Sequence, residues 1–190
     1  MTTKMETKMN TDMNTDMNTT YRRTTMPSPI GTLTIVANDD AVVAIDWDGE
    51  SGHEAMLGDA EIVDVEAGDH APLALAVEQL GEYFDGERTD FDLPLAAAGT
   101  PFQHLAWDAL VRIPFGETVS YGEQATMLGD RNKARAVGAA NGKNPIPIVV
   151  PCHRVVGSNG HLTGFAGGLD AKAWLLDHEF EVRARAGAGD

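Results

Sequence analysis

This chain of 190 residues has a single cysteine, Cys152, which lies in the segment PCHRVV at residues 151–156. The segment directly follows an apolar run at residues 146–150, which predicts that it enters the interior of a domain. One cysteine excludes an internal disulfide and a zinc site built from several cysteines, so packing must hold the fold together.

Cys152 is open to two interpretations from its neighbours alone. Free cysteines are among the most buried residues, and many are small core residues. The adjacent His153, however, can hydrogen-bond toward the sulfur, directly or through one water, and only the thiolate is a competent nucleophile. Arg154 adds positive charge nearby. The segment therefore predicts either a core cysteine or a nucleophile activated by a histidine.

The charge distribution bears on possible partners. The formal net charge is −15, which opposes binding to a polyanion such as DNA. Residues 21–99 hold seventeen acidic and three basic side chains, whereas residues 100–180 hold seven of each. Residues 131–143 carry four basic residues and no acidic one, which makes a local cationic strip. The acidic excess elsewhere fits either a high-salt cytoplasm or an ordinary solvated face.

The sequence carries no sign of a membrane or export segment. No apolar run approaches the roughly 20 residues of a membrane span, and the N-terminus lacks the apolar centre of a signal peptide. We therefore expect a cytoplasmic protein with no membrane partner.

Composition divides the chain into five segments. Residues 1–25 are polar and of low complexity, with Thr-Asp-Met-Asn repeated, which predicts a disordered tail. An α+β domain is expected at residues 26–95, a small-residue linker at 96–99, a second, mainly helical domain at 100–182 and a flexible tail at 183–190.

The first domain shows both strand and helix patterns. Alternating apolar residues predict a β-hairpin over residues 33–47, with further short strands at 61–65 and 91–95. Apolar residues at spacings of four, three and four predict a helix over residues 72–85. His53 and His70 lie in polar surroundings and are expected to be exposed, and nothing in this domain looks catalytic.

The second domain has a helix-turn-helix pattern. Thr100 and Pro101 are typical of a helix start, and that helix is expected to end before residue 114. Ser120 and Glu123 form a capping box that opens a short helix, and a basic helix follows at residues 132–141. Its small residues allow close approach to a DNA groove, although they are equally suited to packing against a neighbouring helix.

Several motifs around Cys152 match one family together. They are GETVSYG at residues 116–122, RAVG at 135–138, NP at 144–145, GFAGG at 164–168 and KAWLLDHE at 172–179. In this order and spacing the chain resembles the O6-alkylguanine-DNA alkyltransferase family, also called methylated-DNA–protein-cysteine methyltransferases. The resemblance runs from about Thr100 to Glu179 and is weaker over residues 28–95. It implies an α+β protein with a small ribonuclease H-like domain followed by a winged helix-turn-helix-like alkyltransferase domain.

The resemblance assigns roles in the chemistry. Cys152 would be the nucleophile, His153 would relay its proton through a water, and Glu179 would orient His153. Tyr121 would crowd the phosphate beside the target nucleotide and donate a hydrogen bond to the purine. Asn144 would have a structural role, tying the turn before the active-site loop to the helix. Val155, Val156, Phe165 and Ala166 would line the pocket, with Phe165 and Ala166 standing where some relatives have tyrosine and serine, which leaves the range of accepted alkyl groups open.

The resemblance also implies how DNA is bound. The partner would be double-stranded DNA carrying O6-alkylguanine, bound in its minor groove by the basic helix, with Lys133, Ala136 and Gly138 near the backbone. Arg135 would fill the space that the flipped nucleotide leaves, and Tyr121 would contact the phosphate. A monomer with no cofactor and no metal site is expected.

The implied activity is DNA repair by a single-turnover, self-inactivating methyltransferase that acts on O6-alkylguanine and on O4-alkylthymine. Two alternatives compete with it. A non-catalytic lesion-binding helix-turn-helix protein would need the basic helix but would have no use for Cys152 beside His153. A cysteine hydrolase would use Cys152, His153 and Glu179 but would leave Arg135 unexplained.

Overall fold

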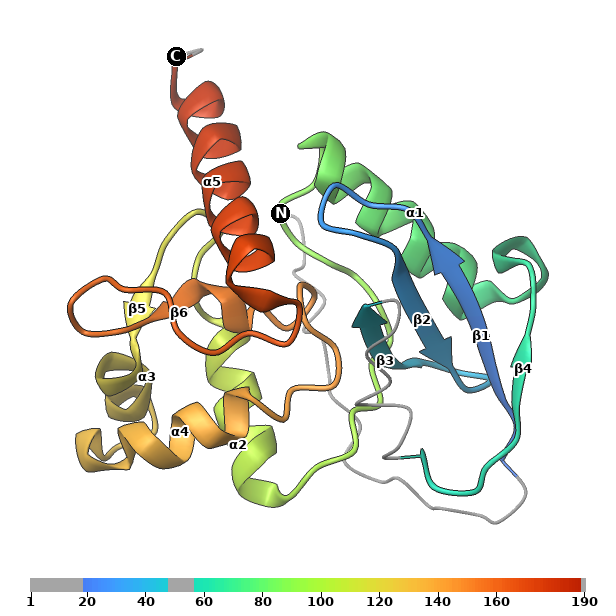
Figure 1. The fold of residues 1–190 in the computed structure, drawn as a ribbon, viewed down its shortest axis with the longest axis horizontal. Coiled ribbons are helices and arrows are strands. Elements are labelled where there is room, and N and C mark those ends of the chain that lie inside the picture. Colours follow the sequence, from blue (N-terminus) through green and yellow to red (C-terminus); the bar gives the residue numbers. More distant parts are fainter. Residues whose placement is uncertain (1–18, 48–56, 189–190) are drawn as a thin grey trace, which may run out of the picture. The chain divides into compact units, whose positions relative to one another are not determined.

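The structure of the chain is a computed structural model that describes residues 19–47 and 57–188. The chain divides between Ala98 and Gly99 into two compact units, whose elements are labelled in Figure 1. Of the helices within the described ranges, none is long and apolar enough to cross a membrane. The predicted exposure of His53 concerns a residue outside the described ranges.

The first unit is a four-stranded sheet with one long helix against it (Figure 1). The strand order is β3-β2-β1-β4, with β1–β2 and β2–β3 antiparallel and β1–β4 parallel. The elements are β1 (Tyr21–Met26), β2 (Leu33–Ala37), β3 (Val42–Trp47), β4 (Ile62–Asp64), a 3₁₀ turn (Ala67–Asp69) and α1 (Ala71–Asp85). The predicted hairpin, third strand and helix are therefore confirmed, whereas residues 91–95 contribute only one bridge, from Leu95 to Val42.

Strand β1 corrects the predicted disorder of residues 1–25, because residues 21–25 lie inside the sheet. The strand is polar in sequence, so it gives no apolar alternation. Its arginines instead pair with carboxylates of neighbouring segments: Arg22 with Asp39, and Arg23 with Asp64 at 2.8 Å. Exposed ion pairs contribute little stability, and backbone hydrogen bonds to two neighbouring strands hold β1 in place.

Helix α1 has clear ends, and its first cap corrects a second prediction. Gly86 ends the helix in the left-handed conformation, with φ of 78°, and its N–H donates to the carbonyls of the last turn. His70, expected to be exposed, is the N-cap residue and is buried, and the charges of Arg22 and Asp39 act on its ring, so the packing of distant segments covers it.

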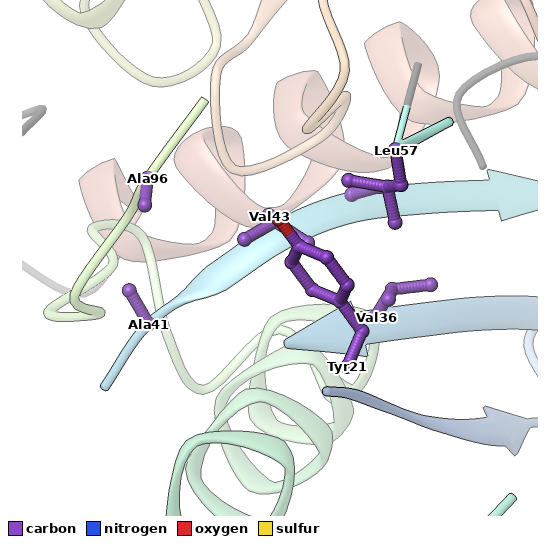
Figure 2. Packing of buried hydrophobic residues seen from close by; sticks show 7 residues of the cluster. Tyr21, Val36, Ala41, Val43, Leu57 and Ala96 are labelled. Carbon is purple, nitrogen blue, oxygen red and sulfur yellow. The ribbon is translucent and has the colours of Figure 1, made fainter. Parts of the chain in front are cut away.

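A second set of buried residues packs on the strands and on the segment that leaves the unit. The set consists of Tyr21, Val36, Ala41, Val43, Ala44, Leu57 and Ala96. Figure 2 shows Val36, Val43 and Leu57 near the ring of Tyr21, with Ala41 and Ala96 further to the left. The Ala96 N–H also donates to the Val42 carbonyl at 2.9 Å. The predicted linker at residues 96–99 therefore begins too early, because Ala96 and Ala97 are buried parts of the first unit.

The second unit is mainly helical, with one two-stranded parallel sheet that pairs Val119 with Val155. Thr100 caps the first helix, as predicted, and forms a capping box with Gln103, whereas the predicted capping box of Ser120 with Glu123 opens the second helix. The elements are α2 (Pro101–Val111), β5 (Val119–Ser120), α3 (Tyr121–Met127), a 3₁₀ turn (Arg131–Lys133), α4 (Ala134–Asn141), a 3₁₀ turn (Cys152–Arg154), β6 (Val155–Val156) and α5 (Gly168–Gly187).

Helix α5 also continues further than expected, so the predicted flexible tail at residues 183–190 is wrong for residues 183–187. Val182 is buried one turn beyond Glu179, and Arg183 bonds the loop before β5, donating to the Gly116 carbonyl at 3.2 Å and pairing with Glu117 at 2.9 Å. These contacts favour continuation of the helix past residue 182.

Candidate active site

Cys152 begins the 3₁₀ turn that leads into β6, and the residue is 9% exposed. Pro151 before it has φ of −81° and ψ of 66°, an inverse γ-turn, and the Cys152 N–H donates to the Val150 carbonyl at 2.8 Å. The same carbonyl accepts from the Asn144 side chain at 2.8 Å. Two donors on one carbonyl fix the backbone from which the thiol projects.

The turn before Cys152 contains a strained residue. Ile148 has φ of 75° and is the one non-glycine residue with positive φ in the described ranges. This conformation costs a β-branched residue roughly 1–3 kcal/mol, so the surroundings must hold it. Asn144 does so by accepting from the Ile146 N–H at 3.1 Å while it donates to Val150. Asn144 therefore links the end of α4 to the Cys152 turn.

His153 and Glu179 are fully buried and bonded to each other. His153 Nε2 lies 2.7 Å from Glu179 Oε1, and the pairing joins the Cys152 turn to α5. Burial alone would raise the pKa of Glu179, but its hydrogen bond to His153 and the charge of Arg154 lower that pKa to about 2. Because the carboxylate is ionised, Nε2 must carry the proton, and the neutral ring presents Nδ1 as an acceptor. Nδ1 is buried and has no hydrogen-bond partner among the described residues.

Lys172 is a fully buried ammonium near the thiol. Its Nζ donates to the Val155 carbonyl at 2.7 Å and to the Thr163 carbonyl at 2.8 Å. Burial raises the pKa of the Cys152 thiol above its ordinary value, whereas a hydrogen bond from Asn144 and the charge of Lys172 act in the opposite direction. The thiol therefore needs a base to lose its proton, and Lys172 makes that loss easier.

Tyr121, the first residue of α3, connects the pocket loop to α4. Its hydroxyl donates to the Thr163 carbonyl at 3.2 Å, the same carbonyl that accepts from Lys172. A Cβ on Gly138 of α4 would lie 3.5 Å from the Tyr121 ring, so the glycine and the ring are neighbours. The tyrosine thus lies where the pocket loop meets the basic helix.

The basic helix presents its charged residues outward. Lys133, Arg135 and Ala136 are exposed, whereas Val137 and Ala140 are buried against the rest of the unit. Trp107 of α2 donates from its indole nitrogen to the Ala140 carbonyl at 2.9 Å. Packing therefore explains Ala140, but it does not explain the small exposed residue Ala136.

The residues predicted to wall the pocket all follow the Cys152–Arg154 turn in the chain. Val155 is buried and Val156 half-buried in β6, and Phe165 and Ala166 lie in the loop that follows. The half-buried Phe165 ring meets the His153 ring edge to face, with centroids 6.3 Å apart. Ala166 is exposed.

Sequence analysis noted the positive charge of Arg154 near the thiol, but it predicted neither the contact of Arg154 with Glu179 nor a role for Lys172 in the site. A signal was present, because Lys172, Leu175, Glu179 and Val182 recur at spacings of three, four and three and so share one helix face. Because Leu175 and Val182 are apolar, this helix face is predicted to be buried, and Lys172 and Glu179 with it.

No group of three or more His, Cys, Asp or Glu residues that could hold a metal ion occurs within residues 19–47 and 57–188.

Comparison with known proteins matches both units to one family. Residues 21–97 match the family model for the 6-O-methylguanine DNA methyltransferase ribonuclease-like domain, and residues 101–181 match the model for the DNA binding domain of the same proteins. The first match begins at β1, in agreement with the ordered strand.

Individual relatives are similar to this chain over most of its length. The methylated-DNA–protein-cysteine methyltransferase of Mycolicibacterium paratuberculosis is 49% identical over 152 residues, which cover 80% of this chain and 88% of that protein. The constitutive enzyme of Bacillus subtilis is 43% identical over 157 residues, covering 82% and 93%. The crystal structure of Mycobacterium tuberculosis OGT in complex with DNA aligns with a TM-score of 0.75 at 42% identity, covering 86% of this chain and 94% of that one.

These comparisons agree on the family of the chain. Both domains match in the expected order, and the relatives are 42–49% identical over most of its length. The chain belongs to the family of methylated-DNA–protein-cysteine methyltransferases, with a ribonuclease-like first domain and a DNA-binding second domain.

Proposed function

We propose that the protein repairs alkylated DNA by moving an alkyl group from O6-alkylguanine, or from O4-alkylthymine, to its own Cys152. The observation that carries this proposal is a buried thiol directly followed in the chain by a buried histidine whose Nε2 is held by Glu179. Glu179 holds His153 Nε2, and Nδ1 is left as an acceptor. Such an arrangement prepares a thiol for deprotonation in a site that water enters poorly.

The proposed reaction is a one-step displacement. The thiol proton leaves, the sulfur attacks the alkyl carbon on O6, a sulfur–carbon bond forms and the carbon–oxygen bond breaks. The electron pair of the broken bond goes to the purine, which takes up one proton and leaves as guanine. The hydrogen lost from Cys152 thus replaces the alkyl group on the base, and the balance needs no cofactor.

His153 is proposed to take the thiol proton at Nδ1, through one bridging water. Glu179 orients the ring and fixes which nitrogen carries hydrogen, as the third member of a triad does. Tyr121 is proposed to donate a hydrogen bond to the departing purine, where negative charge develops. Its hydroxyl bonds Thr163 in the pocket loop, so the base would replace or share that contact.

Binding is proposed to occur in the minor groove of duplex DNA, through α4. A base inside a duplex cannot meet Cys152, so the nucleotide must be flipped out at a cost of a few kcal/mol. The exposed Arg135 would fill the vacated space, and Lys133 would neutralise phosphate. The small residues Ala136 and Gly138 would let the helix backbone approach closely.

The extruded base is proposed to enter a pocket lined by Val155, Val156, Phe165 and Ala166. Because Ala166 offers no hydroxyl, purine recognition would depend on backbone groups and on Tyr121. The product is a thioether, which water does not cleave, so each molecule would act once, as a monomer in a reducing compartment such as the cytoplasm.

The competing interpretation is a protein that binds alkyl lesions without reacting. Intact-protein mass spectrometry after incubation with an O6-methylguanine duplex separates the two, with Cys152→Ser as the control. Transfer predicts a gain of roughly 14 Da in the unsubstituted protein alone, saturating at one group per molecule. Tight lesion binding with no change in mass would favour the non-catalytic reading, and release of product from an unmodified protein would indicate a turnover enzyme.

A further inference from the structure

Arg154 is a buried arginine to which the proposed reaction gives no role. Its guanidinium donates to both oxygens of Glu179, with Nε 2.9 Å from Oε2 and Nη2 3.0 Å from Oε1. Nη1 donates to the Ile113 carbonyl at 2.7 Å, and the guanidinium carbon lies 5.6 Å from the Phe115 ring centroid. These contacts hold a permanent positive charge in one place beside the triad.

The Glu179 carboxylate is therefore shared. Besides His153 and Arg154, it accepts from the Gly116 N–H at 2.9 Å. In a triad the carboxylate stabilises the imidazolium that forms when the histidine takes a proton. Here a guanidinium already balances the negative charge and would repel a second cation next to it. Protonation of His153 thus gains less from Glu179 than it would gain from an unshared carboxylate.

Of the other charged groups around His153, Lys172 acts in the same direction as Arg154, and Glu179 acts against them. Glu179 and Lys172 face it from α5, and Arg154 and Cys152 are its neighbours in the 3₁₀ turn. Burial lowers the pKa of His153 most, Glu179 opposes that effect, and the charges of Arg154 and Lys172 add to it. The ring thus has one anion and two cations around it while Cys152 is a thiol.

We propose that Arg154 is a positioning residue that occupies the Glu179 carboxylate and so keeps His153 neutral, with Nδ1 able to accept the Cys152 proton, down to mildly acidic pH. The inference rests on the proposed role of His153 as the base. It implies that the resting site holds a thiol and a neutral imidazole, not a thiolate–imidazolium pair. The proton then leaves the sulfur when the lesion is in place.

The first test is a pH titration of the histidine ring nitrogens by NMR in the full-length protein without DNA, with the His153 signals assigned from His153→Gln. In the unsubstituted protein His153 is expected in the Nε2–H form, with a midpoint below the ordinary histidine value. In Arg154→Met the midpoint is expected to move to higher pH. The measurement does not depend on alkyl transfer, so it stays informative even if the mass experiment finds none.

The second test is the single-turnover rate of alkyl transfer against pH. Below the pKa of a general base the rate falls about tenfold per pH unit, so Arg154→Met is expected to move the acidic limb to higher pH. Arg183→Met is the matched control. Arg183 bonds Gly116 and Glu117, in the loop whose Gly116 N–H donates to Glu179, but no hydrogen bond from Arg183 to the Glu179 carboxylate is found among the described residues. Its profile is expected to match that of the unsubstituted protein.

A purely structural role for Arg154 predicts different results. Arg154→Met would then lower stability while leaving the His153 midpoint and the acidic limb unchanged, and this outcome would overturn the proposal. If Arg154→Met does not fold, Arg154→Lys keeps the charge but loses the two-point contact, and a smaller shift in the same direction is expected. A His153 midpoint at or above the ordinary value in the unsubstituted protein would overturn the proposal without any variant.

Discussion

The side-chain amides of Gln124 and Asn141 hydrogen-bond each other in both directions and so join α3 to α4. Asn141 Nδ2 donates to Gln124 Oε1 at 2.7 Å, and Gln124 Nε2 donates to Asn141 Oδ1 at 3.1 Å. Gln124 Nε2 also donates to the Ala106 carbonyl of α2 at 3.0 Å. Both amides are buried. One polar pair thus fixes the helices that carry Tyr121 and Arg135.

Breaking this pair on one side is expected to be costly. Gln124→Leu leaves the Asn141 amide buried without its partner, a loss of about 1–3 kcal/mol in the free energy of unfolding. The double variant Gln124→Leu/Asn141→Leu is expected to lose less than the two single variants added together, because neither amide is then left unpaired. Urea denaturation of all three variants measures this coupling. Asn132→Leu removes an exposed amide and is the control, and strictly additive losses would contradict the coupling.

Replacing the buried ammonium beside the thiol is expected to change the reactivity of Cys152. Lys172→Met removes the positive charge that lowers the Cys152 pKa, so that pKa is expected to rise. The rate of thiol modification by iodoacetamide, measured against pH without DNA, should then reach its plateau at higher pH than in the unsubstituted protein. Lys143→Met, at an exposed site, serves as the control. An unchanged pH dependence in folded Lys172→Met would show that this charge does not act on the thiol.

Glu179 is expected to make the second unit sensitive to acid. Its pKa is lowered from an ordinary 4.5 to about 2 in the folded protein. The contribution of Glu179 to the free energy of unfolding is therefore fully present above about pH 4.5 and is lost as the pH falls toward 2. The shift corresponds to roughly 3 kcal/mol. Urea denaturation across this pH range should show the free energy of unfolding decline as the pH falls. In the double variant Glu179→Gln/Arg154→Met this decline should be shallower. Glu181→Gln removes an exposed carboxylate from the same helix and should leave the decline in place.

Local sequence signals predicted the elements that depend on local chemistry. The Thr100-Pro101 start signal, the capping box at Ser120 and the apolar spacing of α1 place the helix starts correctly, because these signals act within one or a few helical turns. Strand β1 was missed because its pairing depends on strands that are distant in the chain, and its own residues are polar. The continuation of α5 to Gly187 depends on contacts of Arg183 that are likewise not local.

In the active site, too, the features set by local sequence were predicted and those set by tertiary contacts were not. The motif around Cys152 identified the nucleophile and the adjacent histidine as candidates, because both lie in one short segment. The partner of His153 is 26 positions away on another helix, and only the family resemblance pointed to Glu179. The burial of Arg154 and Lys172 is a tertiary property. A basic residue is ordinarily expected at the surface, so the charge of Arg154 was expected near the thiol but not buried, and Lys172 was not expected in the site.

The glycine of the basic helix gives a test in which stability and DNA binding move in opposite directions. A Cβ at Gly138 would meet Tyr121 at an ordinary 3.5 Å, so Gly138→Ala is expected to fold and to gain roughly 0.5–1 kcal/mol from helix propensity. If α4 enters a groove, the added methyl group should nevertheless weaken affinity for duplex DNA several-fold, measured by fluorescence anisotropy. Gly81→Ala in α1 is the matched control, because nothing lies within 4 Å of its Cβ, and it should gain stability with no change in affinity. Equal DNA affinity for both variants would mean that α4 does not approach DNA closely at Gly138.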